Sequence, residues 1–143
     1  MKETIKILSA TIAIGLCTLA ACKKETAQTP DYTTGFVGTY TGSVIDSGYT
    51  SNNVRYTSSV GNCQLKVIKD ATTDNQLNLE AYVAGIKSYT AIAQATSLTA
   101  LNIDQQSINA AFKAAGTGQL NSSNIKVELK VSDIKFIKFV GKK

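Results

Sequence analysis

The sequence predicts an all-β fold, an antiparallel meander of about eight strands that forms either a small barrel or a two-sheet sandwich. Apolar residues recur at every second position through most of the chain after residue 36, which is the period of a strand with one buried face. Clusters of Gly, Asn, Asp and Ser interrupt these runs at intervals of about ten residues, as turns do in a meander. Residues 36–143 are enough for one core, and they contain no internal repeat or second domain.

A segment of different character precedes this β domain. Residues 1–6 carry Lys2, Lys6 and one acidic residue, and residues 7–21 contain no charge. A basic start followed by a short apolar run that ends in small residues is typical of a secretory signal peptide. The run is shorter than the roughly 20 apolar residues of a transmembrane helix. We therefore expect residues 1–21 to be a signal-peptide helix that is cleaved, the alternative being an uncleaved anchor helix.

The residues at the expected cleavage point are Leu19-Ala20-Ala21-Cys22. They resemble the lipobox of bacterial lipoproteins, in which Leu, a small residue and Ala or Gly precede a lipid-accepting Cys. The resemblance implies that the thiol of Cys22 receives a diacylglycerol, that the bond before it is cut, and that the new amino group is acylated. Several acyl chains on one residue suffice for stable membrane attachment. Lys23 replaces the Asp that often retains such proteins at the inner membrane, so the resemblance implies an outer-membrane lipoprotein.

Residues 22–35 form the expected link between this anchor and the β domain. They are mostly polar, include the only proline, Pro30, and have no apolar period. Such a composition predicts a flexible tether, so we expect the folded domain to span residues 36–143.

The cysteines exclude an internal disulfide. Cys17 lies in the expected signal peptide and Cys22 is the expected lipidation site, which leaves Cys63 without a partner. Because Cys63 occupies an inward position of an alternating run, we predict a buried thiol rather than a reactive one.

The first predicted strand covers residues 36–45, with Tyr40 and Val44 on one face. Gly38 and Gly42 share that face, where glycine marks a bend or a close backbone crossing. A loop over residues 46–53 and turns at 61–62 and 70–75 separate the next strands. These strands are expected at residues 54–58, 63–69 and 76–83, followed by less regular ones at 88–92 and 96–103.

Residues 104–116 fit two predictions. Asp104 at the start and Gly116 at the end are typical of a capped helix. The same residues also alternate, with Ile108 and Phe112 on one face, and the neighbouring segments all have a period of two. We favour the strand, because a lone helix would interrupt the meander.

The last two strands frame a hairpin. Residues 125–131 alternate apolar and charged side chains, and residues 121–124 supply the turn before them. In the final strand, Phe136 and Phe139 cannot share a face under strict alternation. We predict a β-bulge at Ile137 or Lys138 that buries both aromatic rings and directs Lys135 and Lys138 to solvent.

Three motifs of the β domain are similar to those of small Bacteroidetes-type lipoproteins: Phe36-Val37-Gly38-Thr39-Tyr40-Thr41-Gly42, Gly116-Thr117-Gly118-Gln119-Leu120 and Phe139-Val140-Gly141-Lys142-Lys143. The first motif also resembles the start of lipocalin-like barrels, which open with Gly-x-Trp. Tyr40 stands where the Trp would be, and the later Arg partner of that family has no evident counterpart. An eight-stranded barrel has an interior that holds side chains or one small ligand.

The residue types argue against catalysis. The chain has no histidine, the commonest general base and zinc ligand, and no calcium-loop pattern. Gly116-Thr117-Gly118 neither follows a buried parallel strand nor opens a helix, so it is not a phosphate loop. We therefore predict no enzyme, no catalytic residue, no metal site and no cofactor. Seven carboxylates are left for a hydrolase-like pair, and we expect each to be simply solvated: Asp46, Asp70 and Asp74 in predicted turns, Glu80 and Glu128 at outward positions, and Asp104 and Asp133.

The charge is mildly basic, with 15 Lys+Arg and 10 Asp+Glu, and without residues 1–21 the counts are 13 and 9. Nucleic acid is not an expected partner. The densest basic cluster either docks on anionic surfaces or blocks edge-to-edge aggregation, and it consists of Lys126, Lys130, Lys135, Lys138, Lys142 and Lys143.

These observations lead to one leading hypothesis for function and two alternatives. We expect a non-enzymatic envelope protein, attached to the membrane at Cys22, that binds a small apolar ligand, a glycan or a protein partner. The alternatives are a structural or accessory subunit of an outer-membrane assembly and a hydrolase. An enclosed apolar pocket would indicate a ligand binder, whereas a filled core with an exposed aromatic patch would indicate an assembly subunit.

Overall fold

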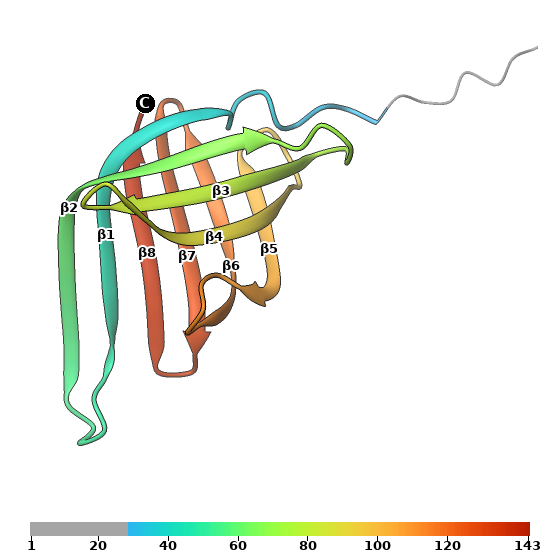
Figure 1. Ribbon diagram of the computed structural model, residues 1–143. Coiled ribbons are helices and arrows are strands. Elements are labelled where there is room, and N and C mark those ends of the chain that lie inside the picture. The colour runs from blue at the N-terminus through green and yellow to red at the C-terminus, as the bar shows by residue number, and fades with distance from the viewer. Residues whose placement is uncertain (1–28) are drawn as a thin grey trace, which may run out of the picture.

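The computed structural model describes residues 29–143, which form a closed barrel of eight antiparallel strands in sequence order (Figure 1). Each strand pairs with the next, and β1 pairs with β8 to close the barrel. The all-β prediction is confirmed, and the barrel is the correct one of its two architectures. Within residues 29–143 no helix is long and apolar enough to cross a membrane. The strands are β1 (Gly38–Tyr49), β2 (Arg55–Lys69), β3 (Gln76–Val83), β4 (Ile86–Ala95), β5 (Ala100–Ser107), β6 (Lys113–Asn121), β7 (Asn124–Ser132) and β8 (Lys135–Lys142).

The core fills the barrel because side chains alternate between its inside and its outside. In β3, Leu77, Leu79 and Ala81 are buried, and the residues between them face outward. This strand begins and ends where the sequence predicts. Cys63 is also fully buried, as predicted, with its thiol 3.2 Å from the carbonyl oxygen of Val60.

β2 differs from the prediction of two strands with a turn at Gly61 and Asn62. The chain stays extended through both residues, and its register with β1 shifts there by one residue, which is a β-bulge. Asn62 has a φ of 54°, in the left-handed region that Asn tolerates. The part of β2 before the bulge pairs with the second half of β1, and together they form a hairpin that projects past the end of the barrel (Figure 1). β1 itself extends to Tyr49, into the segment expected to be a loop.

Residues 104–116 form neither a helix nor one continuous strand. β5 ends at Ser107 and β6 begins at Lys113, and a tight turn joins them. The side-chain oxygen of Asn109 accepts hydrogen bonds from the backbone N–H groups of Ala111 and Phe112, at 2.9 and 2.8 Å. This local bonding competes with the strand ladder and ends it.

The predicted bulge in the final strand is wrong. β8 pairs with β1 in unbroken register, and the extra residue lies in β7, at Val131. Strict alternation in β8 buries Phe139, leaves Phe136 44 % exposed and directs Lys135 inward. One aromatic ring of the pair is therefore on the outer surface.

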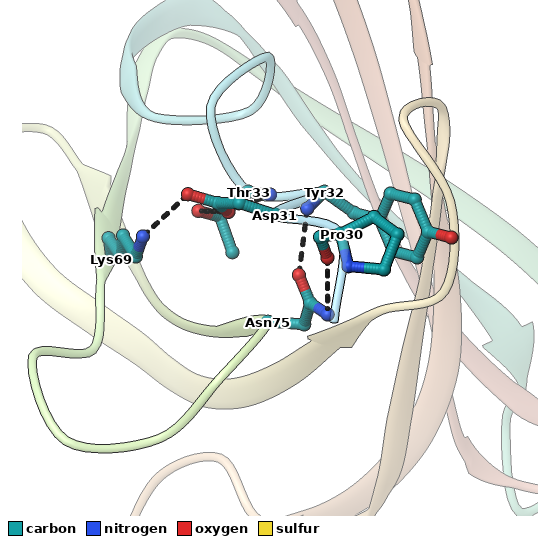
Figure 2. A network of polar contacts seen from close by, with 6 residues as sticks. All are labelled: Pro30, Asp31, Tyr32, Thr33, Lys69 and Asn75. Atoms are coloured by element: carbon teal, nitrogen blue, oxygen red, sulfur yellow. Dashed lines mark hydrogen bonds and ion pairs between the residues drawn. The ribbon is translucent and has the colours of Figure 1, made fainter. Parts of the chain in front are cut away.

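The segment before β1 lies across one end of the barrel (Figure 1), where Figure 2 shows how it is held. The side chain of Asn75 accepts a hydrogen bond from the N–H of Tyr32, at 2.7 Å, and donates one to the carbonyl oxygen of Pro30, at 3.0 Å. Lys69 forms an ion pair of 2.6 Å with Asp31. The chain is therefore attached to the barrel from Pro30 onward, six residues before the expected domain start at residue 36. The reason is that the side chain of Asn75 offers the backbone of this segment both a donor and an acceptor.

Candidate functional site

The interior of the barrel holds little free space. An apolar hollow inside the barrel measures about 30 Å³, which is room for one or two water molecules. Small-molecule sites usually measure roughly 300–1,000 Å³. The side chains therefore fill the interior, and a ligand of ordinary size does not fit there. The residues around the hollow are Val44, Leu65, Leu79, Ala81, Tyr89, Thr90, Ala91, Val127, Leu129, Ile137 and Phe139.

A polar cluster lies below this hollow, at the end of the barrel where the hairpin projects. Lys135 forms an ion pair of 3.3 Å with Asp46, which also accepts a hydrogen bond of 3.1 Å from the hydroxyl of Tyr56. The ammonium of Lys135 lies 4.2 Å from the ring centroid of Phe112. Lys135, Asp46 and Tyr56 are therefore paired with one another, and the ring of Phe112 lies beside the cation, so the cluster holds its charges in internal contacts rather than offering them to a ligand.

A larger hollow lies on the outer face of the sheet, where it forms a groove of about 570 Å³. Five strands contribute to it: β1, β2, β6, β7 and β8. The exposed ring of Phe136 lies in this groove, and Ile45 is the other large apolar side chain that points outward there. The residues lining this outer groove are Ile45, Ser47, Arg55, Thr57, Gly116, Thr117, Glu128, Leu129, Lys130, Phe136, Ile137 and Lys138.

The outer groove is basic. It contains three cations, Arg55, Lys130 and Lys138, and one carboxylate, Glu128. A hydrogen bond and ion pair of 2.9 Å from Lys126, outside the groove, hold the pKa of Glu128 below its usual value, and Lys138 lies farther away, at 3.7 Å. Lys130 in turn pairs with Asp133 at 2.7 Å, so Arg55 is the groove cation that forms no ion pair within residues 29–143. The groove therefore carries a modest excess of positive charge beside an exposed aromatic ring.

One wall of the outer groove is an unpaired strand edge. β2 pairs with β3 only from Gln64 to Lys69. Within residues 29–143, no strand pairs with the other side of β2 from Arg55 to Cys63. Arg55 and Thr57 belong both to this edge and to the groove lining, so the two features are continuous.

The structure distributes the predicted carboxylates over the surface. Asp70 accepts hydrogen bonds from the hydroxyl and N–H of Thr72, which lower its pKa to about 2, and it organises the β2–β3 turn. Glu80 pairs with Lys87 at 2.8 Å. In the described part of the chain, no three Cys, Asp or Glu side chains gather as a metal site would require. Cys22 lies outside the described residues.

Sequence reasoning missed the outer groove, although two of its three cations, Lys130 and Lys138, were singled out as part of a lysine cluster. The groove depends on which strands pair and in what register, and no residue pattern in a single strand reveals that. The available signal was the spacing of Phe136 and Phe139, which leaves one ring exposed if the strand is regular.

Comparison of the chain with models of protein families finds no match. Searches among curated proteins and among solved structures likewise find none.

Proposed function

We propose that this protein is a lipid-anchored protein of the bacterial envelope whose barrel is a non-enzymatic binding module for a protein partner. The observation that carries the proposal is the contrast between the two hollows. The interior leaves about 30 Å³, whereas the outer groove offers about 570 Å³ beside the exposed ring of Phe136. Aromatic residues and Arg are enriched at protein interfaces, and both occur in this groove.

The anchor rests on the sequence Leu19-Ala20-Ala21-Cys22, which follows a basic start and a short apolar run. Acylation of Cys22 would attach the barrel to the membrane, and Lys23 favours the outer membrane. The absence of histidine from the chain supports a binding role over a hydrolytic one.

Of the three classes of binding partner expected from the sequence, the groove favours a protein. A small apolar ligand would need an enclosed apolar space, which the filled interior lacks. The role of accessory subunit in a larger assembly fits the same groove, since it also requires a partner on an exposed surface.

The test compares three variants of the full chain in its native membrane. We expect Cys22→Ser to release the protein into the soluble fraction or to leave it unprocessed. We expect Phe136→Ser to reduce the yield of proteins chemically crosslinked to the barrel by about tenfold, because it removes the aromatic contact in the groove. Val140→Ser is the matched control, since Val140 also faces outward from β8 and is similarly exposed but does not line the groove.

Two results would contradict this proposal. Membrane attachment of a normally processed Cys22→Ser protein would refute the anchor. Equal crosslinking yields for Phe136→Ser and Val140→Ser would refute the groove as the binding surface.

A further inference from the structure

We propose that the unpaired edge of β2 receives an extended acidic segment of the partner protein as an added β-strand. This inference rests on the proposed function, because it specifies how the groove holds a protein. Strand addition to an exposed edge is a common mode of peptide recognition, with affinity from backbone hydrogen bonds and specificity from the side chains beside them.

Within residues 29–143, the backbone of β2 has hydrogen-bonding groups at this edge that no other strand uses. The N–H of Tyr49 donates to the carbonyl oxygen of Ile134, at 3.2 Å, so it points away from β2. Tyr49 lies opposite Arg55 in the β1–β2 ladder. In an antiparallel ladder, the backbone groups of two opposite residues either point toward each other or both point away, so those of Arg55 point away from β1. Arg55, and by alternation Thr57 and Ser59, therefore direct N–H and C=O groups to the empty side of β2.

Between β4 and β5, where the strands also pair over only a short stretch, a side chain bonds to the backbone that the ladder leaves unpaired. β4 and β5 pair only at Gln94 with Asn102 and at Ala95 with Leu101. Farther along that seam, the side chain of Gln106 accepts from the N–H of Ile92 at 2.7 Å and donates to its carbonyl oxygen at 2.6 Å. In the described residues, the side-chain contact with the backbone of β2 between Arg55 and Cys63 is that of the Cys63 thiol with the carbonyl oxygens of Val60 and Gly61, at 3.2 and 3.6 Å, which leaves Arg55, Thr57 and Ser59 uncovered.

β2 has few of the usual defences of an edge strand. Residues 55–62 contain no proline and no lysine, Arg55 is their one charged side chain, and the bulge comes only at the end of this stretch. Their side chains are mostly small and polar, and almost all are exposed. The edge is thus long, accessible and compatible with a partner strand.

Charge selects an acidic segment as the occupant. An added strand would lie next to Arg55 and Thr57, so its side chains on that face would extend the basic outer groove. Glutamate or aspartate at every second position of the segment would face Arg55 and complement the groove cations. A second copy of this chain is disfavoured, because edge-to-edge pairing would bring two basic grooves together.

The position of the edge also favours a protein over the anchoring membrane. The hairpin that carries it projects from the end of the barrel opposite to the segment at Thr29 (Figure 1). The seven residues from Cys22 to Thr29 span at most about 25 Å. An anchor at Cys22 would therefore keep the other end of the barrel near the lipid and leave the hairpin facing away from it.

The experiment uses the full-length acylated protein in detergent and two fluorescent peptides of roughly eight residues, the length of the free edge. One peptide alternates glutamate and valine, and the other alternates lysine and valine. We expect the acidic peptide to bind at least about tenfold more tightly, and we expect binding to slow hydrogen exchange at the amides of Arg55, Thr57 and Ser59.

Two substitutions separate the backbone contribution from that of charge. Thr57→Pro removes an N–H that β1 does not use, so it should weaken binding of the acidic peptide about tenfold while the barrel stays folded. Thr57→Ala is the matched control and should change affinity less than about twofold. Arg55→Glu should reverse the preference between the two peptides.

Each alternative outcome overturns the inference. Binding that survives Thr57→Pro, without protection of the three amides, would indicate attraction of anions to the groove and no added strand. A dimer in solution that Thr57→Pro dissociates would make a second copy the occupant. Because the anchor and Phe136 are tested by fractionation and crosslinking, failure here would leave those results standing.

Discussion

Tyr40 is the largest completely buried side chain in the described part of the chain, and its surroundings fix the protonation state of its phenol. Its hydroxyl donates a hydrogen bond of 2.8 Å to the carbonyl oxygen of Phe36. The ammonium of Lys143 lies 5.2 Å from its ring centroid and donates to the carbonyl oxygen of Gly35, at 2.9 Å. Lys143 thus places a cation beside the ring of Tyr40, for which the sequence showed no Arg partner. Burial raises the pKa of Tyr40 to about 12.

This shift predicts a loss of stability in alkali. Because the folded-state pKa is above the unfolded value of 10.0, the stabilising effect is complete below pH 10 and is lost as the pH rises toward 12. We expect Tyr40→Phe to unfold about 1 kcal/mol more easily at pH 8, where it lacks the hydrogen bond. Urea unfolding from pH 8 to 11.5 should show this gap closing as the pH rises, since Phe does not ionise. A constant gap over that range would show that the phenol is not protected.

At the scale of strands, close approach of neighbouring backbones requires glycine at specific positions. A Cβ added to Gly116 in β6 would lie 2.0 Å from the carbonyl oxygen of Glu128 in β7. We expect Gly116→Ala to reduce the free energy of unfolding by at least about 2 kcal/mol, because the added methyl group would clash with a backbone atom, which cannot rotate away as a side chain can. Gly61→Ala is the control: no heavy atom lies within 4 Å of its added Cβ, so the change should stay within about 0.5 kcal/mol. Equal thermal shifts for the two variants would contradict this explanation.

The strands also show where sequence reasoning succeeds and where it stops. β3 could be predicted to the residue, because its inward leucines alternate without interruption and turn residues flank it. The prediction for the final strand is wrong because it assumed that Phe136 and Phe139 are both buried. Three residues apart, they can share a face only if the strand has a bulge, whereas Phe136 is in fact exposed. The extra residue lies in β7 instead, and its place depends on the pairing of two strands, which neither segment encodes alone. For the same reason the outer groove, built from five strands, could not be predicted as a whole; the spacing of Phe136 and Phe139 signalled only that a regular strand exposes one ring.

At the scale of the whole molecule, the two ends of the barrel differ. One end is closed by the segment that carries Pro30 and Asp31, which Asn75 and Lys69 hold in place (Figure 2). The Lys69 hydrogen bond holds the pKa of Asp31 well below its usual range, so the carboxylate stays ionised in acidic as well as neutral solution. The other end carries the projecting hairpin and the free edge of β2. A tether attached at the closed end would therefore orient the binding edge away from the membrane.

If Cys22 is acylated as proposed, this orientation can be measured on the full-length protein in vesicles that contain a fluorescent acceptor lipid. Thr73→Cys places a donor dye in the exposed turn near the closed end, and Ser51→Cys places one at the tip of the hairpin. The native thiol of Cys63 is buried, so it should not react. The 12 residues of β1 span at most roughly 36 Å, and the hairpin projects from the end of the barrel opposite to the segment before β1 (Figure 1), so energy transfer to the lipid should be stronger from Thr73 than from Ser51. Equal transfer, or stronger transfer from Ser51, would mean that the hairpin approaches the lipid and would remove the geometric argument for a protein partner at that end.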